Sequence, residues 1–207
     1  MLFAARGVRL TCLEPDPAMA EVARRNLAPY DADVVGTSFE EWQPTERQPL
    51  LYAAQAWHWV SPAARCTKAH DLLRPGATLA LFWNVGAYSD VDLREAMDET
   101  YRQLAPDTPD TWRPRHAQDP LTSNDWAATE IAASALFGPV TISRHRWQTA
   151  YSSEAWIELS STQSNHRMLD DATRDALFDR VREVVAAHGG IVDVEYTATA
   201  YLAKALD

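Results

Sequence analysis

The stretch Gly7–Pro17, GVRLTCLEPDP, constrains the fold of this 207-residue chain more than any other. It is a short apolar run that ends on an acidic residue, Glu14, and is followed at once by a helix signal. Asp16 before Pro17 is typical of a helix start, because an aspartate side chain caps the first turn and proline needs no hydrogen-bond partner there. The apolar residues that follow at helical spacing, and predict one buried stripe, are Met19, Val22, Ala23 and Leu27.

Glu14 is the first candidate for a binding site. In open α/β sheets an acidic residue at the carboxyl end of a buried strand binds a pair of ribose hydroxyls. The dinucleotide-binding pattern places a glycine-rich loop about 20 residues before that acid. That position lies before Met1, and the seven glycines form no G-x-G. Residues 1–6 are typical of the end of a helix closed by Gly7. We therefore expect the first strand and the glycine loop to be missing.

Strands and helices alternate along the rest of the chain. Apolar segments that predict strands are 32–36, 49–59, 77–84 and 140–147, and the helix signals begin at Ser61-Pro62, Val91, Asp125, Ser153 and Asp170. Buried strands separated by helices favour a parallel sheet covered on both faces. Residues 191–203 alternate apolar and polar side chains instead, which is typical of an antiparallel strand. The pattern predicts an α/β, Rossmann-like, doubly wound and mostly parallel sheet with a C-terminal antiparallel strand.

We expect a single domain over 1–207 with an insert at 86–137. The insert contains a proline-rich stretch with Trp112, Arg113 and Arg115. A long loop of this kind in a compact domain is usually functional, so we interpret it as a lid over a substrate site. A disordered surface excursion is the alternative, and the two arginines are either ligands for an acidic substrate or solvated loop residues.

The composition limits the classes of partner. The net charge is −10 and no basic cluster interrupts it, so we expect no nucleic-acid partner. No apolar run reaches membrane-spanning length, and the first residues carry no signal-peptide pattern. We expect a cytoplasmic protein without a membrane partner. Cys12 and Cys66 fit no metal spacing, nor do the six histidines, so we assign no metal.

Four segments together resemble one known family. They are Leu13–Met19 (LEPDPAM), Gly36–Trp42 (GTSFEEW), Gln55–Trp59 (QAWHW) and Leu72–Gly76 (LLRPG). In this order and between these strands, the chain resembles the class I S-adenosylmethionine-dependent methyltransferases over its whole length, and most closely the small-molecule methyltransferases. The resemblance implies S-adenosylmethionine as cofactor and a small-molecule substrate as partner.

The resemblance also implies roles for individual residues. Glu14, with Pro15 beside it, would accept hydrogen bonds from both ribose hydroxyls. The adenine would be held at Thr37, Ser38 and Phe39, although this family often has an aspartate where Thr37 stands. The methionine part and the sulfonium would lie beside Gln55 and Ala56. Trp57 or Trp59 would stabilise the sulfonium by cation–π attraction, and His58 would act as a general base toward a hydroxyl or amine.

Structural roles compete with each of these assignments. Thr37 and Ser38 are also good turn residues, and Phe39 is also a good core residue. On a strand end, Trp57 and Trp59 would share one side, so at least one of them would pack under the following helix. His58 would then point to the opposite side, where a structural hydrogen bond competes with catalysis.

Three functions stay open. The first is methyl transfer to a small molecule; the second is a non-catalytic, N-terminally truncated remnant that binds a partner or forms a homo-oligomer. The third is an NAD-dependent oxidoreductase, since Glu14 suits that ribose equally well, although the C-terminal helix and antiparallel strand favour the first. Without the first strand, two apolar strand edges would be unpaired. If the chain starts at Met1, we expect weak cofactor binding or none, and a strained or oligomeric fold.

Overall fold

The computed structural model describes residues 2–107 and 125–207. The chain divides into two compact units: Met1–Ala80 with Ile131–Val140 and Ala203–Asp207, and Leu81–Glu130 with Thr141–Leu202. The single domain over 1–207 stays a prediction. The centre of the expected lid, with Trp112, Arg113 and Arg115, lies outside the described residues.

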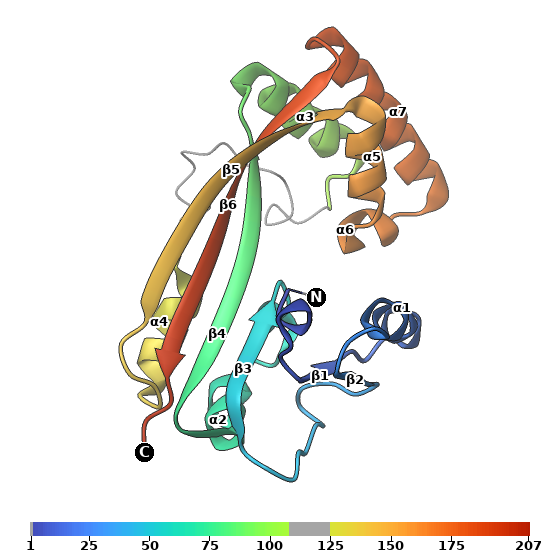
Figure 1. Ribbon diagram of the computed structural model, residues 1–207. Helices are drawn as coiled ribbons and strands as arrows, with labels where there is room; N and C mark the ends of the chain where they lie inside the picture. Colours follow the sequence, from blue (N-terminus) through green and yellow to red (C-terminus); the bar gives the residue numbers. More distant parts are fainter. Residues whose placement is uncertain (1, 108–124) are drawn as a thin grey trace. The chain divides into compact units, whose positions relative to one another are not determined.

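The strands form two sheets (Figure 1). β1 (Leu10–Leu13) and β2 (Ala32–Val35) pair in parallel. The second sheet has the order β3-β4-β6-β5, with β5 and β6 antiparallel. Its strands are β3 (Gln48–Ala54), β4 (Leu73–Tyr88), β6 (Ile191–Lys204) and β5 (Thr141–Ser152). The predicted mixed α/β architecture with a terminal antiparallel strand is confirmed.

Helix α1 (Pro17–Leu27) begins where the sequence predicts. The Asp16 carboxylate accepts a hydrogen bond from Met19 N at 2.8 Å, and Pro17 is the first helical residue. The predicted buried stripe is partly wrong, because Met19 is 52% exposed and Val22 is 38% exposed while Leu27 is buried. We attribute the difference to the sheet under α1, since a two-stranded sheet covers only a narrow part of a helix.

The first unit has its own small core around the start of the chain. Ala4, Leu10 and Leu27 are buried there, and the Phe3 ring lies 4.9 Å from the ring of Tyr52 on β3. The expected helix end is a single 3-10 turn, η1 (Ala4–Arg6), closed by Gly7 at φ 77°. Among the described strands, β1 pairs only with β2, and β3 is the first strand of the other sheet. Within the described residues, each of these two strands therefore has one edge without a partner strand.

The strand expected over 49–59 ends early. β3 stops at Ala54, Gln55 has a φ of 55°, and Trp57–Trp59 form a 3-10 turn, η2. The predicted alternation of the two tryptophans with His58 on a strand is therefore wrong. A left-handed residue turns the chain out of the strand path, so the side chains that follow no longer alternate across a sheet.

Helix α2 (Arg65–Leu72) begins three residues later than Ser61-Pro62 predicts. Ser61 N donates to the Glu40 carboxylate at 2.9 Å, and the Ser61 carbonyl accepts from both Ala64 N and Arg65 N in a turn. The strand predicted over 77–84 is longer than expected, because β4 already begins at Leu73. Gly76 keeps a φ of 72° inside the strand, and its N–H donates to the Ala205 carbonyl.

The second unit packs helices against the sheet around a large apolar core. Its helices are α3 (Val91–Leu104), α5 (Ser153–Ser161), α6 (Ser164–Arg167) and α7 (Asp171–Ala187), and α4 (Trp126–Ser134) starts in this unit. The residues buried in that core include Tyr88, Leu93, Met97, Trp156, Leu177, Val181, Val185, Val192 and Val194. α7 ends at Ala187, and just beyond it Gly190 N donates to the Val185 carbonyl at 2.8 Å.

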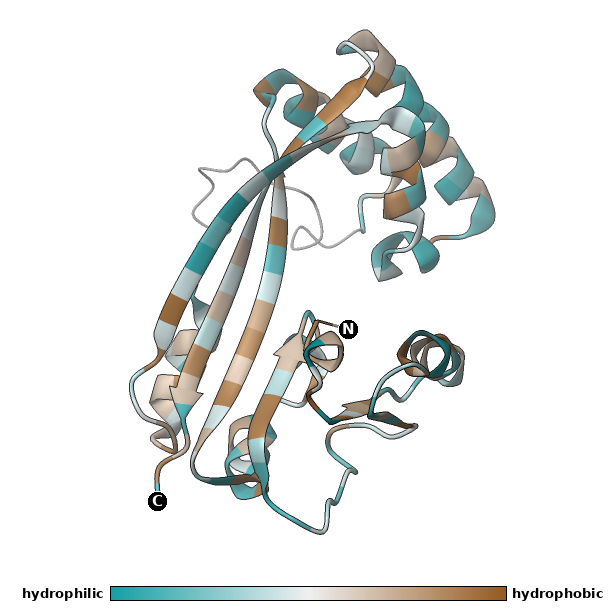
Figure 2. Ribbon diagram, viewed as in Figure 1, coloured by the Kyte–Doolittle hydropathy of each residue, from teal (hydrophilic) through white to brown (hydrophobic). Residues whose placement is uncertain are grey.

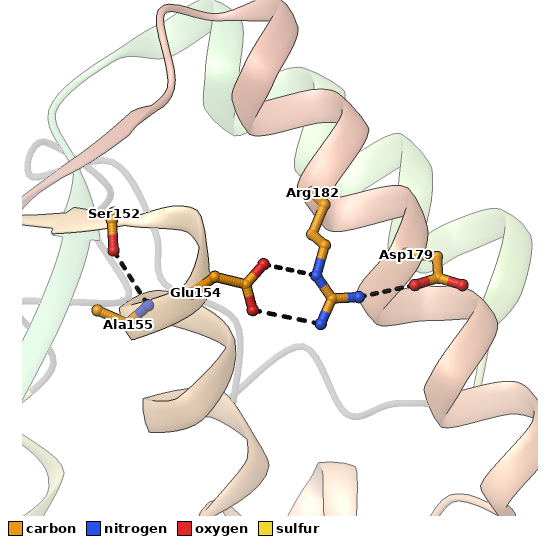
Figure 3. A network of polar contacts seen from close by, with 5 residues as sticks. All are labelled: Ser152, Glu154, Ala155, Asp179 and Arg182. Carbon is orange, nitrogen blue, oxygen red and sulfur yellow. Dashed lines mark hydrogen bonds and ion pairs between the residues drawn. The ribbon is translucent and has the colours of Figure 1, made fainter.

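An exposed polar network joins α5 to α7 (Figure 3). The Arg182 guanidinium donates to both oxygens of Glu154, at 2.7 and 3.4 Å, and to Asp179 at 2.7 Å. Beside it, the Ser152 hydroxyl caps α5 by accepting from Ala155 N at 3.3 Å. These groups orient two surface helices, and exposed ion pairs of this kind contribute little to stability.

The β5–β6 pair carries an aromatic stack. Trp147 stands opposite Tyr196 in the register, and their rings stack with centroids 4.4 Å apart at 13°. Trp147 Nε1 donates to Asn84 on β4 at 3.1 Å. Figure 2 shows the middle of β5 as hydrophilic, where Arg144, His145 and Arg146 lie. β5 is an edge strand, and charged side chains on an edge oppose edge-to-edge aggregation.

Candidate functional site

The candidate residues of the first unit follow the carboxyl ends of β1, β2 and β3. Glu14 comes directly after β1, and Thr37 comes two residues after β2. The carbonyl of Val35 accepts hydrogen bonds from both Glu14 N, at 3.1 Å, and Thr37 N, at 3.0 Å. This shared acceptor joins two segments that lie more than twenty residues apart in the sequence, so the structure brings together the predicted ribose and adenine residues.

Glu14 is held at the start of α1. Its Oε1 accepts from Asp16 N at 3.0 Å, and the side chain is half-buried. Pro15 lies between these two acids and is exposed. A carboxylate has several acceptor positions on its two oxygens, so one bond to a backbone N–H leaves capacity for hydroxyl donors. The geometry is compatible with the predicted ribose contact.

The loop after β2 is a compact turn with half-buried side chains. The Ser38 hydroxyl accepts from Glu41 N at 3.2 Å, and its carbonyl accepts from Trp42 N at 3.1 Å. The Phe39 ring lies 6.0 Å from the Trp57 ring, and Lys68 Nζ lies 5.9 Å from the Phe39 ring centroid. Ser38 and Phe39 thus have the turn and packing roles that the sequence also allows, and their adenine role stays a prediction.

Gln55 marks the end of β3 with a strained backbone. A φ of 55° is rare for a residue with a side chain and costs on the order of 1–3 kcal/mol. Gln55 and the following Ala56 are both exposed. Strain of this kind persists only where the surrounding structure enforces it, and it concentrates at functional sites. The observation singles out the segment that the sequence assigns to the methionine part of the cofactor.

The two tryptophans of η2 have different surroundings. Trp57 is only 1% exposed, and the guanidinium carbon of Arg65 lies 5.7 Å from its ring centroid. Trp59 is 64% exposed. The expectation that at least one of them packs against the following helix is confirmed by Trp57. Trp59 is thus the more exposed of the two tryptophans.

His58 lies between them on the exposed side of η2. Its ring centroid is 5.1 Å from that of Trp59. Partial burial lowers the pKa of His58 below its usual value, and the nearby positive charge of Arg65 lowers it further. Both causes disfavour the imidazolium. His58 is therefore neutral at pH 7 and has a nitrogen able to accept a proton.

Two residues that the sequence did not single out shape this site. Arg65 donates to the carbonyls of Trp57 and Val60, and Glu40 accepts from Ser61 N. Arg65 is the first residue of α2. The helix dipole disfavours a cation at a helix N-terminus. An arginine at the start of a helical pattern is therefore an unusual choice, and this is the sequence signal that would have identified Arg65. Glu40 offered no comparable signal.

Residues 2–107 and 125–207 contain neither a candidate metal cluster nor a helix that could span a membrane. No group of three or more His, Cys, Asp or Glu side chains there is arranged to hold a metal ion. None of the helices in that part of the chain combines the length and the apolar character needed to cross a membrane.

Comparison with known proteins relates the chain to methyltransferases. Uncharacterized methyltransferases of Mycobacterium bovis and Mycobacterium tuberculosis are each 27% identical over 199 residues, which cover 95% of this chain and 72% of the relative. No protein-family model matches. A candidate type II methyltransferase from Anaeromyxobacter dehalogenans superposes with a TM-score of 0.57 at 16% identity, covering 96% of this chain and 81% of that one.

The chain is similar in sequence to the mycobacterial methyltransferases and in fold to further methyltransferases. A candidate methyltransferase from Bacillus halodurans has a TM-score of 0.54 at 15% identity, covering 99% of this chain and 86% of that one. An N-methyltransferase of Haemonchus contortus, in complex with phosphomonomethylethanolamine and S-adenosylhomocysteine, has a TM-score of 0.51 at 10% identity. It covers 99% of this chain and 46% of that one. These comparisons agree with the resemblance to methyltransferases that the sequence predicts.

Proposed function

We propose that this methyltransferase homologue transfers a methyl group from S-adenosylmethionine to a small-molecule acceptor. The observation that carries the proposal is the Val35 carbonyl, which joins Glu14 and Thr37 at the carboxyl ends of two adjacent parallel strands. In open α/β sheets this edge is where nucleotide ligands bind. The Haemonchus contortus neighbour, whose structure contains S-adenosylhomocysteine, supports the same type of cofactor.

The donor and acceptor groups of the first unit fit this cofactor in part. Glu14 offers carboxylate oxygens to the ribose hydroxyls, and the exposed Gln55 and Ala56 offer amide and backbone groups to the methionine part. Trp57 fits poorly as a direct cation–π partner, since its ring is enclosed and already faces Arg65. We assign that contact to Trp59, because its ring is exposed.

When bound, S-adenosylmethionine supplies the methyl group, and the chain has to align the acceptor and exclude water. His58 is our candidate general base for an acceptor hydroxyl or amine. Its neutral imidazole takes the acceptor proton, and the charge of Arg65 keeps the imidazole neutral to lower pH. A base with a lowered pKa is weaker, so this role suits acceptors that lose their proton easily.

The test is transfer of a labelled methyl group from S-adenosylmethionine to a panel of small hydroxyl, amine and thiol compounds. We expect transfer to at least one acceptor, a large loss in Glu14→Ala, and wild-type transfer in Glu21→Ala. Glu21 is an exposed acid on α1 whose ion-pair partner is Arg24, so its variant controls for the loss of one negative charge. Binding of NAD in place of S-adenosylmethionine would refute the proposal.

His58→Gln separates catalysis from binding. We expect it to lower the transfer rate while leaving the affinity for S-adenosylhomocysteine unchanged. The pH dependence gives the second readout. Because the pKa of His58 is lowered, the rate should rise with pH through a pKa below the ordinary histidine value of about 6.5 and then stay level. A profile without this step, or a His58→Gln enzyme with the wild-type rate, would exclude His58 as the base.

A further inference from the structure

Arg65 is a buried cation next to the candidate site. Its residue is only 6% exposed, and arginine is seldom buried to this degree unless its charge is well partnered. It is also the first residue of α2, where the helix dipole disfavours a positive charge. Burial and the helix dipole both disfavour the positive charge of Arg65, so another interaction has to stabilise it.

Backbone carbonyls at both ends of the η2 turn stabilise the Arg65 guanidinium. Arg65 Nη1 donates to the Trp57 carbonyl at 3.0 Å and to the Val60 carbonyl at 3.2 Å. Val60 N also donates to the Trp57 carbonyl at 3.2 Å. One guanidinium therefore binds the first residue of the turn and the residue just after it, while its carbon lies 5.7 Å from the Trp57 ring centroid. Hydrogen bonds from a charged donor are stronger than those from a neutral one.

We propose that Arg65 is the positioning residue of the candidate active site, holding the Trp57–Val60 turn so that Gln55 and His58 stand at the end of β3. The proposal rests on the proposed function, because it assigns a purpose to that turn. The backbone strain at Gln55 needs a structure that enforces it. The two hydrogen bonds from Arg65 to the turn that follows Gln55 (the Arg65 clamp) supply such an interaction.

Other charges near the turn act elsewhere. Lys68, also on α2, donates to the Glu40 carbonyl at 2.8 Å, and the Glu40 carboxylate accepts from Ser61 N at 2.9 Å. These two hydrogen bonds connect the loop after β2 to α2 and to Ser61. The charge that acts on the His58 imidazole is that of Arg65. Arg65 thus has two separable effects, on the geometry of the turn and on the protonation of His58.

Two substitutions separate the effects without any ligand. Arg65→Lys keeps the charge but lacks the planar fork of donors, and Arg65→Met keeps only the aliphatic stem. Arg74→Met is the matched control. Arg74 lies on β4, and its Nε also donates to a backbone carbonyl, that of Arg47, at 2.9 Å. NMR spectra of the full chain report the His58 ring titration and the backbone amides of residues 55–60 in each variant.

We expect the His58 pKa to rise in Arg65→Met and to stay low in Arg65→Lys. The amides of residues 55–60 should shift or broaden in both variants and match the wild type in Arg74→Met. If Arg65→Met does not fold, Arg65→Lys still tests the clamp through the amides. Wild-type amide positions at residues 55–60 in Arg65→Lys, or an unchanged His58 pKa in a folded Arg65→Met, would overturn the proposal.

A parallel titration with S-adenosylhomocysteine keeps this proposal distinct from the function. If the wild-type chain binds S-adenosylhomocysteine and Arg65→Lys binds it at least about tenfold more weakly, the result supports both the proposed function and the positioning role of Arg65. Tenfold is the scale expected for losing a hydrogen bond from a charged donor. Wild-type chain that does not bind, with the NMR shifts as expected, would contradict the proposed function alone. Equal binding by wild type and both Arg65 variants would overturn the positioning role.

Discussion

Gly86→Ala tests how closely the second unit is packed. A Cβ atom at Gly86 would lie 2.7 Å from Tyr196 Cε1 and 3.1 Å from both Tyr196 Cδ1 and Val194 Cγ1. Real Cβ contacts are essentially never as short as the first of these. The Tyr196 ring has little room to retreat, because it stacks on Trp147 at 4.4 Å and its hydroxyl lies 3.2 Å from that of Tyr151.

The size of the effect follows from two opposing contributions. An added methyl group in a packed core costs about 1–3 kcal/mol. The backbone of Gly86 is outside the left-handed region, so the gain from a less flexible unfolded chain, about 0.4–1 kcal/mol, applies in full. We expect a net loss of roughly 1–2 kcal/mol in the free energy of unfolding. For a chain of this size that corresponds to a melting temperature lower by about 2–8 °C.

The assay is urea unfolding followed by near-UV circular dichroism, to which the stacked Trp147 and Tyr196 contribute together with the other aromatic side chains. Gly138→Ala is the control, since the nearest atom to a Cβ there is the Lys204 carbonyl oxygen at 3.8 Å. It should be neutral or slightly stabilising. A Gly86→Ala protein as stable as the wild type, with an unchanged near-UV spectrum, would show that the stack is looser than described and refute the reasoning.

Three further predictions concern stability. Asp90→Ala removes the cap of α3, whose carboxylate accepts from Asp92 N and Leu93 N, and should cost about 1 kcal/mol in urea unfolding. Arg182→Gln should leave the melting temperature unchanged, because its ion pairs are exposed. Burial lowers the pKa of His166, so the unfolded chain takes up its proton first as pH falls below about 6.5. Stability should decline from there toward the lower folded pKa, and His166→Gln should reduce that slope in urea midpoints compared at pH 5 and 7.5.

Helix caps and hydrophobic periodicity in the sequence correctly predicted two helix starts and the C-terminal strand. Asp16-Pro17 started α1 as expected, α3 begins at Val91 as predicted, and the alternating segment near the C-terminus forms the antiparallel strand β6. In each case a cap or a periodic pattern lies within a few residues of the feature it sets.

Contacts between distant residues decided the rest. Ser61-Pro62 has the local form of a helix start, but residues 62–64 form a turn and the helix begins at Arg65, next to a long-range hydrogen bond from Ser61 N to Glu40. Nothing in the residue types predicts a left-handed Gln55, since glycine and asparagine are the usual choices there. The predicted site residues follow the ends of β1, β2 and β3, and their binding roles stay predictions. The clamp by Arg65 depends on tertiary contacts that no local pattern encodes.

The central claim is that the carboxyl ends of β1 and β2 bind the ribose of the cofactor through Glu14. Isothermal titration of S-adenosylhomocysteine into the 207-residue chain, beside Glu14→Ala and Glu21→Ala, tests it most directly. The account predicts binding by the wild type and by Glu21→Ala at similar affinity. It predicts binding weakened about tenfold or more in Glu14→Ala, since hydrogen bonds to a charged acceptor are lost. Equal affinity in Glu14→Ala, or no binding by folded wild-type chain, would contradict it.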